Sequence, residues 1–346
     1  MRRCGLVYDE RYLLHDTGNH PESPLRLSHT MEHLGASGLL DRLELVEPAY
    51  VPMESVLSVH TLDYIERLRG LVEQGIPLDA DTPLSSFSLD AALLAAGGVL
   101  IGIVGALEGA KVFALVRPPG HHATRNRGMG FCLLNSPAIA AQHVLDCRAA
   151  SRVLIVDFDQ HHGNGTQEIF YHTSSVLYVS THCPHIFPGT GSMEEIGEGD
   201  GEGFTVNLPM SAGSGDVEYA LVYRDVVLPI ALQYAPDVVI VSAGFDIHRY
   251  DPLGRMDVTE RGICAVVSTC LFIAEQCCGG GVIFELEGGY HLDALARSVG
   301  AVLRQMLSEH PSPPEHFVPE MDEKVPPSVR HLKEKVRRTF SQYWEL

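Results

Sequence analysis

Aspartate and histidine occur together in one short run that could bind a metal ion. Asp157, Asp159 and His161 stand at every second position after the apolar segment 152–156, and in an extended strand end such residues point to one side. A lone histidine is more often structural, but carboxylates at the end of an apolar strand are costly to bury unless a cation pairs with them. Two acids and one histidine, here Asp159, His161 and Asp246, leave one position open on a tetrahedral Zn²⁺ ion, which is typical of a catalytic site.

A histidine pair and a tyrosine have the chemistry to move protons and to stabilise negative charge. His121 and His122 follow the turn Arg-Pro-Pro-Gly, so one imidazole could act as general base and acid while its neighbour tunes the charge. Tyr290 follows two glycines, which let the backbone approach a ligand closely while the phenol donates to a developing oxyanion. A chance histidine pair and an ordinary Gly-Gly turn are the alternatives that these motifs leave open.

Short apolar runs that alternate with longer helix-like stretches must position these groups, and this pattern is typical of βαβ units around a mostly parallel sheet. The predicted strands are 111–116, 152–158, 176–180, 237–242 and 281–286, and the predicted helices are 89–107, 136–145, 217–234, 259–276 and 292–307. The polar groups follow four of these strands. Because the carboxyl ends of parallel strands share one edge of a sheet, we expect the four groups to converge on one pocket.

The length and composition predict a globular chain with one large domain. The 346 residues exceed the usual domain size, but α/β domains often reach it, and two smaller domains are the alternative. Apolar residues make up 45% of the chain and charged residues 20%, and no run is expected to be long and apolar enough to span a membrane. The formal charge of 25 − 44 = −19 disfavours binding to nucleic acids and favours cationic partners.

The cysteines and the chain ends predict the compartment and the domain limits. The eight cysteines show no CxxC spacing and no secretory leader is recognised, so we expect a reduced, cytoplasmic protein without cysteine zinc sites. After residue 309 the composition changes to prolines and then to a charged stretch. Residues 1–309 are predicted to form a single catalytic domain, and residues 310–346 a C-terminal Pro-rich arm and helix that packs on the domain or on a partner subunit.

Together these motifs resemble the zinc-dependent histone deacetylase and acetylpolyamine amidohydrolase family. The resemblance covers roughly residues 5–305 and is carried by the segments His20-Pro-Glu-Ser-Pro-Leu-Arg26, Arg117-Pro-Pro-Gly-His-His-Ala123, Gly128-Met-Gly-Phe-Cys-Leu-Leu-Asn135, 157–167, Phe187-Pro-Gly-Thr-Gly191, Ser242-Ala-Gly-Phe-Asp246, Asp251-Pro-Leu-Gly254 and Leu286-Glu-Gly-Gly-Tyr290. Several of these segments are closer to the bacterial and class II members than to class I. The resemblance implies an α/β protein with the three-layer α/β/α arginase-deacetylase fold around a mostly parallel eight-stranded sheet.

The resemblance also implies roles for single residues in a deacetylase domain. Zn²⁺ would be held by Asp159, His161 and Asp246, which agrees with the spacing. The catalytic set would comprise His122 as proton shuttle, His121 as its electrostatic partner held by Asp157, Asn164 beside the pair, and Tyr290 as oxyanion donor. Class I members carry Asp at the position of Asn164. Since a neutral amide stabilises an imidazolium less than a carboxylate does, His122 should stay neutral more easily here.

For the substrate, the resemblance implies a narrow channel between Phe131 and Phe187, a backbone contact from Gly130, and an acetate exit beside Arg26. Leu253 stands where polyamine-preferring relatives of one branch carry an acidic residue, which favours acyl-lysine or another small acylated amine. The acids Asp79 and Asp81 could meet a cation at the rim of the channel or be ordinary solvated side chains.

A second ion and one unusual residue are expected behind the zinc site. The resemblance implies a structural K⁺ ion bound by Asp157, Ser180 and Thr181, together with the backbone oxygens of Asp159 and His161. Gln160 replaces the hydrophobic residues that are common in the family. Because it alternates away from its two neighbours, we expect its effect behind the site rather than in it.

We therefore predict a zinc-dependent amidohydrolase that removes acetyl or other acyl groups from acyl-lysine or from a small acylated amine through attack by a metal-activated water. The first alternative is an acetylpolyamine amidohydrolase, because the negative charge also suits polyamine cations. A two-metal, arginase-like ureohydrolase fits the histidine pair and the Glu-Gly-Gly-Tyr segment poorly. A non-catalytic acyl-amine binding protein is the alternative from another class. The sequence leaves a homo-oligomer open, and it also leaves open whether Zn²⁺ or Fe²⁺ is the native metal.

Overall fold

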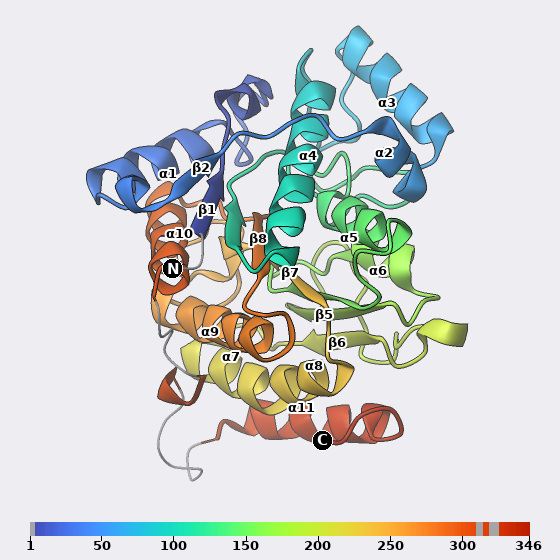
Figure 1. Ribbon diagram of the computed structural model, residues 1–346, viewed down its shortest axis with the longest axis vertical. Helices are drawn as coiled ribbons and strands as arrows, with labels where there is room; N and C mark the ends of the chain where they lie inside the picture. Colours follow the sequence, from blue (N-terminus) through green and yellow to red (C-terminus); the bar gives the residue numbers. More distant parts are fainter. Residues whose placement is uncertain (1–3, 309–313, 318–324) are drawn as a thin grey trace.

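Eight parallel strands form the central sheet in the computed structural model, which describes residues 4–308, 314–317 and 325–346 (Figure 1). The strands are β1 (Cys4–Val7), β2 (Glu44–Val46), β3 (Lys111–Ala114), β4 (Val153–Asp157), β5 (Val176–His182), β6 (Thr205–Pro209), β7 (Val238–Ala243) and β8 (Val282–Leu286). Their order across the sheet is β2-β1-β3-β8-β7-β4-β5-β6. The four strands whose ends are predicted to carry the polar groups, β3, β8, β7 and β4, are therefore direct neighbours.

The helices follow the strands in the alternation expected from the sequence. They are α1 (Leu25–Ala36), α2 (Met53–Val59), α3 (Leu62–Gln74), α4 (Ser88–Leu107), α5 (Ser136–Asp146), α6 (Asn164–Phe170), α7 (Asp216–Val222), α8 (Leu228–Tyr234), α9 (Glu260–Cys277), α10 (Leu292–Met306) and α11 (Pro327–Phe340). The helix predicted over 217–234 is thus not one regular α-helix, because residues 223–227 form a π-helical segment between α7 and α8. Side chains that accept backbone hydrogen bonds begin several helices, for example Asn135 at α5 and Thr259 at α9.

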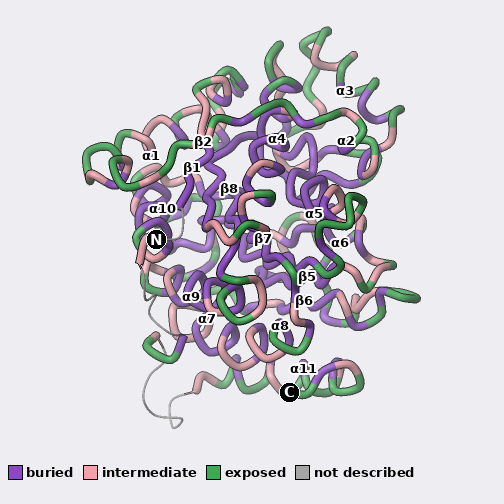
Figure 2. Tube along the Cα trace, in the orientation of Figure 1, coloured by how far each residue is buried: buried purple, intermediate pink, exposed green. Residues whose placement is uncertain are grey.

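Both faces of the sheet are covered by helices. Every residue of β3, β4, β7 and β8 is buried, and successive side chains of a strand point to opposite faces. A parallel sheet in which both sets are buried has helices packed on each side. Figure 2 shows this buried centre surrounded by helices whose outer turns are exposed. The predicted three-layer α/β/α fold is confirmed, with a sheet that is parallel throughout.

Helix α4 corrects the expectation that no segment could span a membrane. Its 20 residues are long and apolar enough to do so by length and composition alone. In the structure, however, 72% of its most apolar window is buried inside the protein. Gly102 of this helix lies directly against β8, because a Cβ atom added there would come 2.2 Å from Ile283 Cδ1. A core helix that packs on both its sheet and its neighbours has the same composition as a membrane span.

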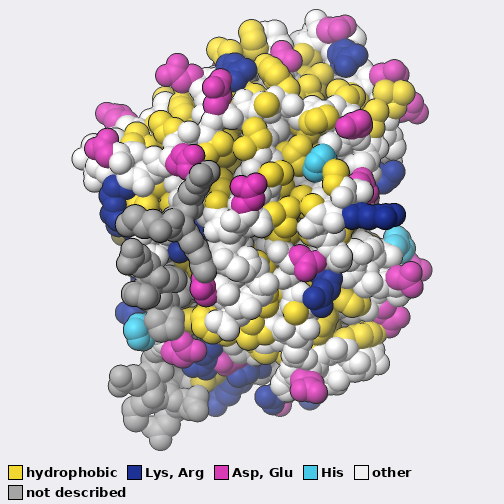
Figure 3. Space-filling model, in the orientation of Figure 1, with side chains coloured by type: hydrophobic (Ala, Val, Ile, Leu, Met, Phe, Trp, Pro, Cys, Tyr) yellow, Lys and Arg dark blue, Asp and Glu magenta, His cyan; other side chains and the backbone are white. Residues whose placement is uncertain are grey.

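The acidic side chains are divided between the interior and the surface. Seven acids of the described residues are buried, and several of them lie at the strand ends: Glu22, Asp157, Asp159, Asp246, Asp251, Glu285 and Glu287. On the face shown in Figure 3, the exposed acidic side chains are dispersed among basic and apolar ones, and Lys and Arg gather over α11 at the lower edge. The formal charge of −19 therefore overstates the acidity that a partner would meet on this face.

The last helix and the residues after it pack on the domain. The apolar side of α11 is buried, and Trp344 donates from Nε1 to the carbonyl oxygen of Gly203 at 2.9 Å. The indole ring also contacts Phe204 and Tyr234, with centroid distances of 5.5 and 6.4 Å. The predicted domain boundary between residues 309 and 310, and most of the Pro-rich arm, lie outside the described residues.

Replacing Trp344 with phenylalanine is expected to lower the free energy of unfolding by about 1–2 kcal/mol, because a buried carbonyl loses its donor and a smaller ring fills the site less well. Urea denaturation followed by circular dichroism would measure the change, since the variant lacks the only tryptophan. Gln342→Ala, at an exposed position of the same turn, is the control. Equal stability of the two variants would show that the indole of Trp344 adds nothing beyond what a phenyl ring provides.

Candidate active site

A pocket of about 380 Å³ opens at the carboxyl edge of the sheet. Residues after β3, β4, β7 and β8 line it, together with three loops of the rim: Asp81, Pro119, His121, His122, Gly130, Phe131, Asp159, His161, Ile186, Phe187, Leu253, Arg255, Gly288 and Tyr290. The predicted convergence of four strand ends therefore occurs. It follows directly from the order of the strands, because β3, β8, β7 and β4 end side by side.

Three side chains at the base of the pocket form a candidate metal site. The ligand atoms of Asp159, His161 and Asp246 all lie within 4.8 Å of one another. Backbone N–H groups hold the carboxylates in place, since His161 and Gly288 donate to Asp159 at 2.8 and 2.9 Å, and Gln160 donates to Asp246 Oδ1 at 3.0 Å. The two acids are fully buried and His161 is half-buried.

This donor set fits a Zn²⁺ ion. The atom Oδ2 of Asp246 is buried and accepts no hydrogen bond from the described residues, although His161 Nδ1 lies only 2.8 Å away. The same nitrogen is 3.1 Å from Asp159 Oδ1. An imidazole and two carboxylates directed at one point are the ligands that a catalytic zinc takes, with one position left for water or substrate. Gly288 leaves room for them, because a Cβ atom there would come 2.5 Å from Asp159 Oδ2.

The charges of this group depend strongly on one another. Burial opposes a charge on His161, but its close contacts with the carboxylates of Asp159 and Asp246, and their attraction, outweigh it and raise its pKa to about 10. Burial and the neighbouring Asp159 raise the pKa of Asp246 to about 7. Burial also disfavours the charge on Asp159, but His121 and His161 outweigh it and lower its pKa. A divalent cation would relieve the repulsion between the two carboxylates.

The two adjacent histidines have different partners. Asp157 Oδ2 lies 3.0 Å from His121 Nδ1 and also accepts a hydrogen bond from Tyr178 at 3.0 Å. His122 instead contacts the amide oxygen of Asn164 through Nδ1, at 2.9 Å. Asp157 is thus turned to His121 and does not join the candidate metal site, although its spacing in the sequence suggests one side for all three residues.

These partners give the two imidazoles opposite protonation tendencies. Burial disfavours a charge on His121, but attraction by Asp157, Glu287 and Asp159 outweighs it and raises its pKa well above the usual value. For His122, burial and the repulsion of His121 and His161 together lower the pKa well below the usual value. His122 is therefore the neutral member of the pair, with Nε2 as the remaining acceptor, which suits a general base.

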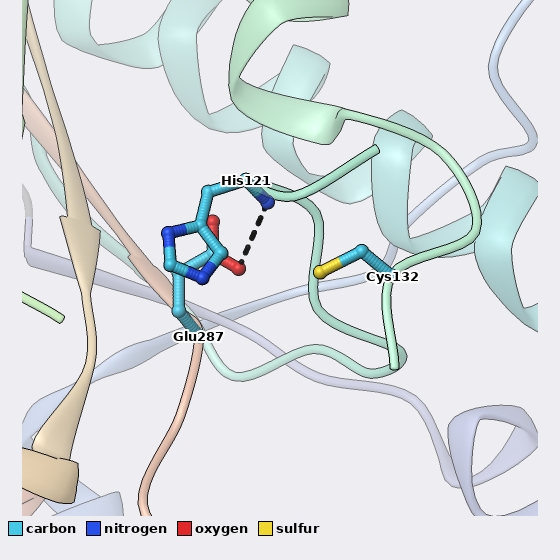
Figure 4. Close-up of side chains that lie close together, drawn as sticks. All are labelled: His121, Cys132 and Glu287. Carbon is cyan, nitrogen blue, oxygen red and sulfur yellow. Dashed lines mark hydrogen bonds between the residues drawn. The ribbon is translucent and has the colours of Figure 1, made fainter. Parts of the chain in front are cut away.

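A second group of potential metal ligands, His121, Cys132 and Glu287, lies at the histidine loop. Figure 4 shows His121, Cys132 and Glu287 close together, with the backbone N–H of His121 donating to Glu287 at 3.2 Å. The same carboxylate accepts from Gly120 N–H at 2.7 Å. Burial raises the pKa of Glu287 to about 7 and that of the Cys132 thiol well above its usual value. Glu287 positions the loop through these two hydrogen bonds, and a thiol that keeps its proton suits a cation poorly.

Tyr290 also lines the pocket, and its backbone is held by a hydrogen bond. Its N–H donates to Asp251 Oδ2 at 2.6 Å, and the guanidinium of Arg26 lies 5.0 Å from the ring centroid. The phenol hydroxyl makes no hydrogen bond to another residue of the described chain, so it is available to a ligand. Burial raises the pKa of this phenol well above its usual value, and it remains a donor at neutral pH.

Aromatic side chains narrow the entrance of the pocket. Phe131 lies 5.8 Å from Tyr290 and Phe187 lies 5.0 Å from His122, measured between ring centroids. Gly130 has φ +56°, and a Cβ atom there would come 2.7 Å from both His122 and Phe187. Only glycine leaves this part of the channel open. The structure therefore brings Gly130, Phe131, Phe187 and Leu253 together as predicted.

The residues predicted to bind potassium lie directly behind this site. Asp157 at the end of β4 pairs with Ser180 of β5, and Thr181 follows on the same strand. All three are buried. Ser180 Oγ contacts His182 Nδ1 at 2.9 Å, and Thr181 Oγ1 contacts the hydroxyl of Tyr223 at 3.0 Å.

A buried ionic network that the sequence analysis did not assign supports the tyrosine turn. Glu22 accepts from Arg117 at 2.8 Å and from Arg26 at 3.1 Å. Burial raises the pKa of Glu22, but Arg117, His15 and Arg26 outweigh it and hold the carboxylate charged. Arg26 also donates to the backbone oxygens of Glu287 and, at 2.7 Å, Gly289. The acid and the arginines belong to segments that carry the family resemblance, and their pairing was not visible in the sequence.

Comparison with known proteins identifies the family of this chain. Residues 20–306 match the Histone deacetylase domain. The chain is 38% identical over 354 residues to a probable deacetylase of Archaeoglobus fulgidus, and the match covers 99% of this chain and 98% of that protein. It is also 40% identical over 318 residues to histone deacetylase 15 of Arabidopsis thaliana, with 88% of this chain and 56% of that protein covered.

The fold is similar to that of a solved deacetylase structure. The crystal structure of the HDA15 HD domain superimposes with a TM-score of 0.89 at 36% sequence identity, covering 99% of this chain and 95% of that one. These likenesses confirm the predicted family and fold. The chain belongs to the histone deacetylase family and is a hydrolase of the deacetylase type.

Proposed function

We propose that this deacetylase is a zinc-dependent amidohydrolase that removes acetyl or other acyl groups from acyl-lysine side chains or from a small acylated amine. The observation that carries the proposal is the arrangement of three groups around one pocket. Asp159, His161 and Asp246 offer the zinc ligands at its base. The neutral His122 and Tyr290, whose hydroxyl has no hydrogen-bond partner among the described residues, line the same pocket. When bound there, Zn²⁺ would act as a Lewis acid on the amide carbonyl and would make water more acidic.

His122 performs the proton transfers in this mechanism. Its Nδ1 is engaged with Asn164, so Nε2 accepts the proton of the attacking water. His121, charged through its contact with Asp157, disfavours a second positive charge next to it and so favours the return of that proton. His122 then gives the proton to the nitrogen of the leaving amine. Acetate and a free amine are the products.

Tyr290 stabilises the charge that develops on the carbonyl oxygen. Tyr290, whose backbone is held by Asp251, lines the pocket, and none of the described residues forms a hydrogen bond with its hydroxyl. A donor that is oriented in advance contributes more to the transition state than a solvated one, because it needs no reorganisation.

The rim favours acyl-lysine over acetylated polyamines. Leu253 presents an apolar side chain at the mouth, and Arg255 beside it would repel a second cationic centre of a polyamine. Asp81 stands on another part of the rim, where it can pair with a cation or accept from a peptide N–H. One acid and one base suit a peptide backbone on both sides of the modified lysine.

We also propose a structural K⁺ ion bound through Asp157, Ser180 and Thr181. The buried position of these residues and the pairing of Asp157 with Ser180 support it. Asp157 already carries the charge that orients His121, so a cation here would reduce the energetic cost of burying that carboxylate.

A panel of substrates tests the proposal. The zinc-loaded protein is expected to release acetate from an acetyl-lysine peptide with a kcat/KM about fivefold or more above that for acetylated spermidine. A fivefold factor corresponds to ~1 kcal/mol, the energy of one exposed ion pair. Longer acyl-lysine peptides, arginine and a chelator-treated sample complete the panel. Replacing K⁺ by Na⁺ in the buffer tests the potassium proposal.

The other outcomes of the panel have clear meanings. Preference for acetylated spermidine would assign the polyamine alternative, and release of urea from arginine would assign the ureohydrolase. Tight hydroxamate binding by the zinc-loaded protein without turnover of any substrate would indicate a non-catalytic protein that binds acylated amines.

A further inference from the structure

We infer that Gln160 is a specificity-determining positioning residue that holds the loop carrying Leu253 and Arg255 at the mouth of the pocket; this inference rests on the function proposed above. Gln160 is fully buried between the candidate metal ligands Asp159 and His161 in the chain. It does not itself line the pocket. Leu253 and Arg255, which lie on the loop that Gln160 holds, both line the pocket.

The side-chain amide of Gln160 makes two hydrogen bonds to the backbone of this loop. Its Nε2 donates to the carbonyl oxygen of Leu253 at 2.7 Å, and its Oε1 accepts from the N–H of Arg255 at 2.8 Å. These partners fix the orientation of the amide, because a carbonyl requires a donor and an N–H requires an acceptor. An apolar side chain of the same length could make neither bond.

The same loop is held at its other end by Asp251. The carboxylate of Asp251 accepts from Leu253 N–H at 3.0 Å and from Tyr290 N–H at 2.6 Å. Gly254 packs closely below, since a Cβ atom there would come 2.5 Å from the backbone oxygen of Asp246. Asp251 thus links the loop to the tyrosine wall, and Gln160 links it to the candidate metal ligands.

These two attachments, together with a hydrogen bond from Gly213 N–H to the carbonyl oxygen of Arg255 at 2.8 Å, determine where the mouth of the pocket lies. Leu253 is 39% exposed, so few packing contacts of its own hold its side chain against the channel. Without Gln160 the carbonyl of Leu253 and the N–H of Arg255 would exchange their buried partner for water, and the segment between Asp251 and Arg255 would become mobile. Recognition of the part of the substrate outside the channel would weaken, whereas the reacting groups below would keep their positions.

Gln160 also touches a candidate zinc ligand, and the experiment must separate the two effects. Its Nε2 lies 3.5 Å from Nε2 of His161. A role through the metal would change zinc content and kcat, whereas a role through the loop changes KM and selectivity. The test therefore measures the bound metal together with both kinetic constants.

The variant Gln160→Met, of similar length and without hydrogen-bonding groups, is expected to raise KM for an acetyl-lysine peptide by about tenfold, the equivalent of about 1.4 kcal/mol, with kcat and zinc content nearly unchanged. Its preference for the peptide over acetylated spermidine should fall. The side-chain amide of Gln160→Asn is shorter and reaches at most one partner, so its KM should lie between those of the wild type and Gln160→Met. In a double-mutant cycle, Leu253→Ala should then add little in the Gln160→Met background.

Hydrogen exchange at the Arg255 amide tests the attachment without any substrate, and Gln160→Met should accelerate it. Unchanged exchange, an additive cycle with Leu253→Ala, or loss of zinc with KM unaffected would each overturn the inference. If the wild-type chain hydrolyses no substrate of the panel, the proposed function fails by itself, and the exchange experiment still decides whether Gln160 holds the loop.

Discussion

Tyr290→Phe is expected to lower kcat by about 100-fold or more, the loss found when one donor to a developing oxyanion is removed. The phenol hydroxyl has no hydrogen-bond partner among the described residues, so its removal breaks no bond of the folded protein. The ring keeps its contacts with Arg26 and Phe131. Zinc content and thermal stability should therefore change little while turnover falls.

The kinetic pattern distinguishes this role from a structural one. A group that acts only on the transition state lowers kcat and kcat/KM together, whereas a binding group raises KM. Tyr250→Phe is a matched control, because this exposed tyrosine lies near the same turn, 6.1 Å from His291 between ring centroids. Activity of Tyr290→Phe close to that of Tyr250→Phe would remove Tyr290 from the mechanism.

The burial pattern explains which parts of the fold the sequence predicts. Strands β4 and β7 are continuous apolar runs buried on both faces, and their predicted ends lie within one residue of the observed ends. Strand β2 lies at the edge of the sheet with two of three residues exposed, so no apolar run marks it. Strand β6, at the other edge, contains the buried Asn207, which donates to Gln167. Edge strands carry weaker patterns than central ones.

The candidate site, too, could be predicted only in part from the sequence. Strand ends of a parallel sheet meet at one edge, so Asp159, His161, Asp246 and Tyr290 could be predicted from their position after a strand. The residues that hold the loops around these groups could not be predicted in this way. Gln160 bonds to backbone atoms 93 and 95 positions away, and every residue offers the same backbone groups. Such partners leave no signal in a single sequence, even when the side chain itself is conspicuous.

Asp246→Asn is expected to abolish turnover, because it removes a proposed ligand of the zinc ion rather than a group around it. Changes in residues outside the first ligand sphere typically cost ~10–100-fold in metal affinity, and loss of a direct ligand should cost more than that. Asparagine preserves the shape of the side chain and can still accept from Gln160 N–H. Asp200→Asn, at an exposed position, is the matched control.

Metal binding gives a measurement that does not depend on activity. Zn²⁺ at ~100 times its Kd should stabilise the wild-type chain by about 2.7 kcal/mol, and the same concentration should shift the melting temperature of Asp246→Asn far less. One bound zinc per wild-type chain would agree with the three donors found, and two would favour the ureohydrolase. A full zinc-induced shift in Asp246→Asn would contradict the assignment of this ligand.

The pH dependence of zinc binding to the wild-type protein follows from His161. Its neighbours Asp159 and Asp246 raise its pKa to about 10, so the imidazole holds a proton at neutral pH that a metal must displace. Above pH ~8, where Asp246 with its pKa of about 7 has lost its own proton, the affinity for zinc should therefore rise by about tenfold per pH unit while His161 releases one proton. In Asp246→Asn one of the two carboxylates that raise this pKa is gone, so the released fraction of a proton should be smaller at the same pH. Calorimetry in buffers of different ionisation enthalpy measures that fraction, and equal proton release by both proteins would show that Asp246 does not control the charge of His161.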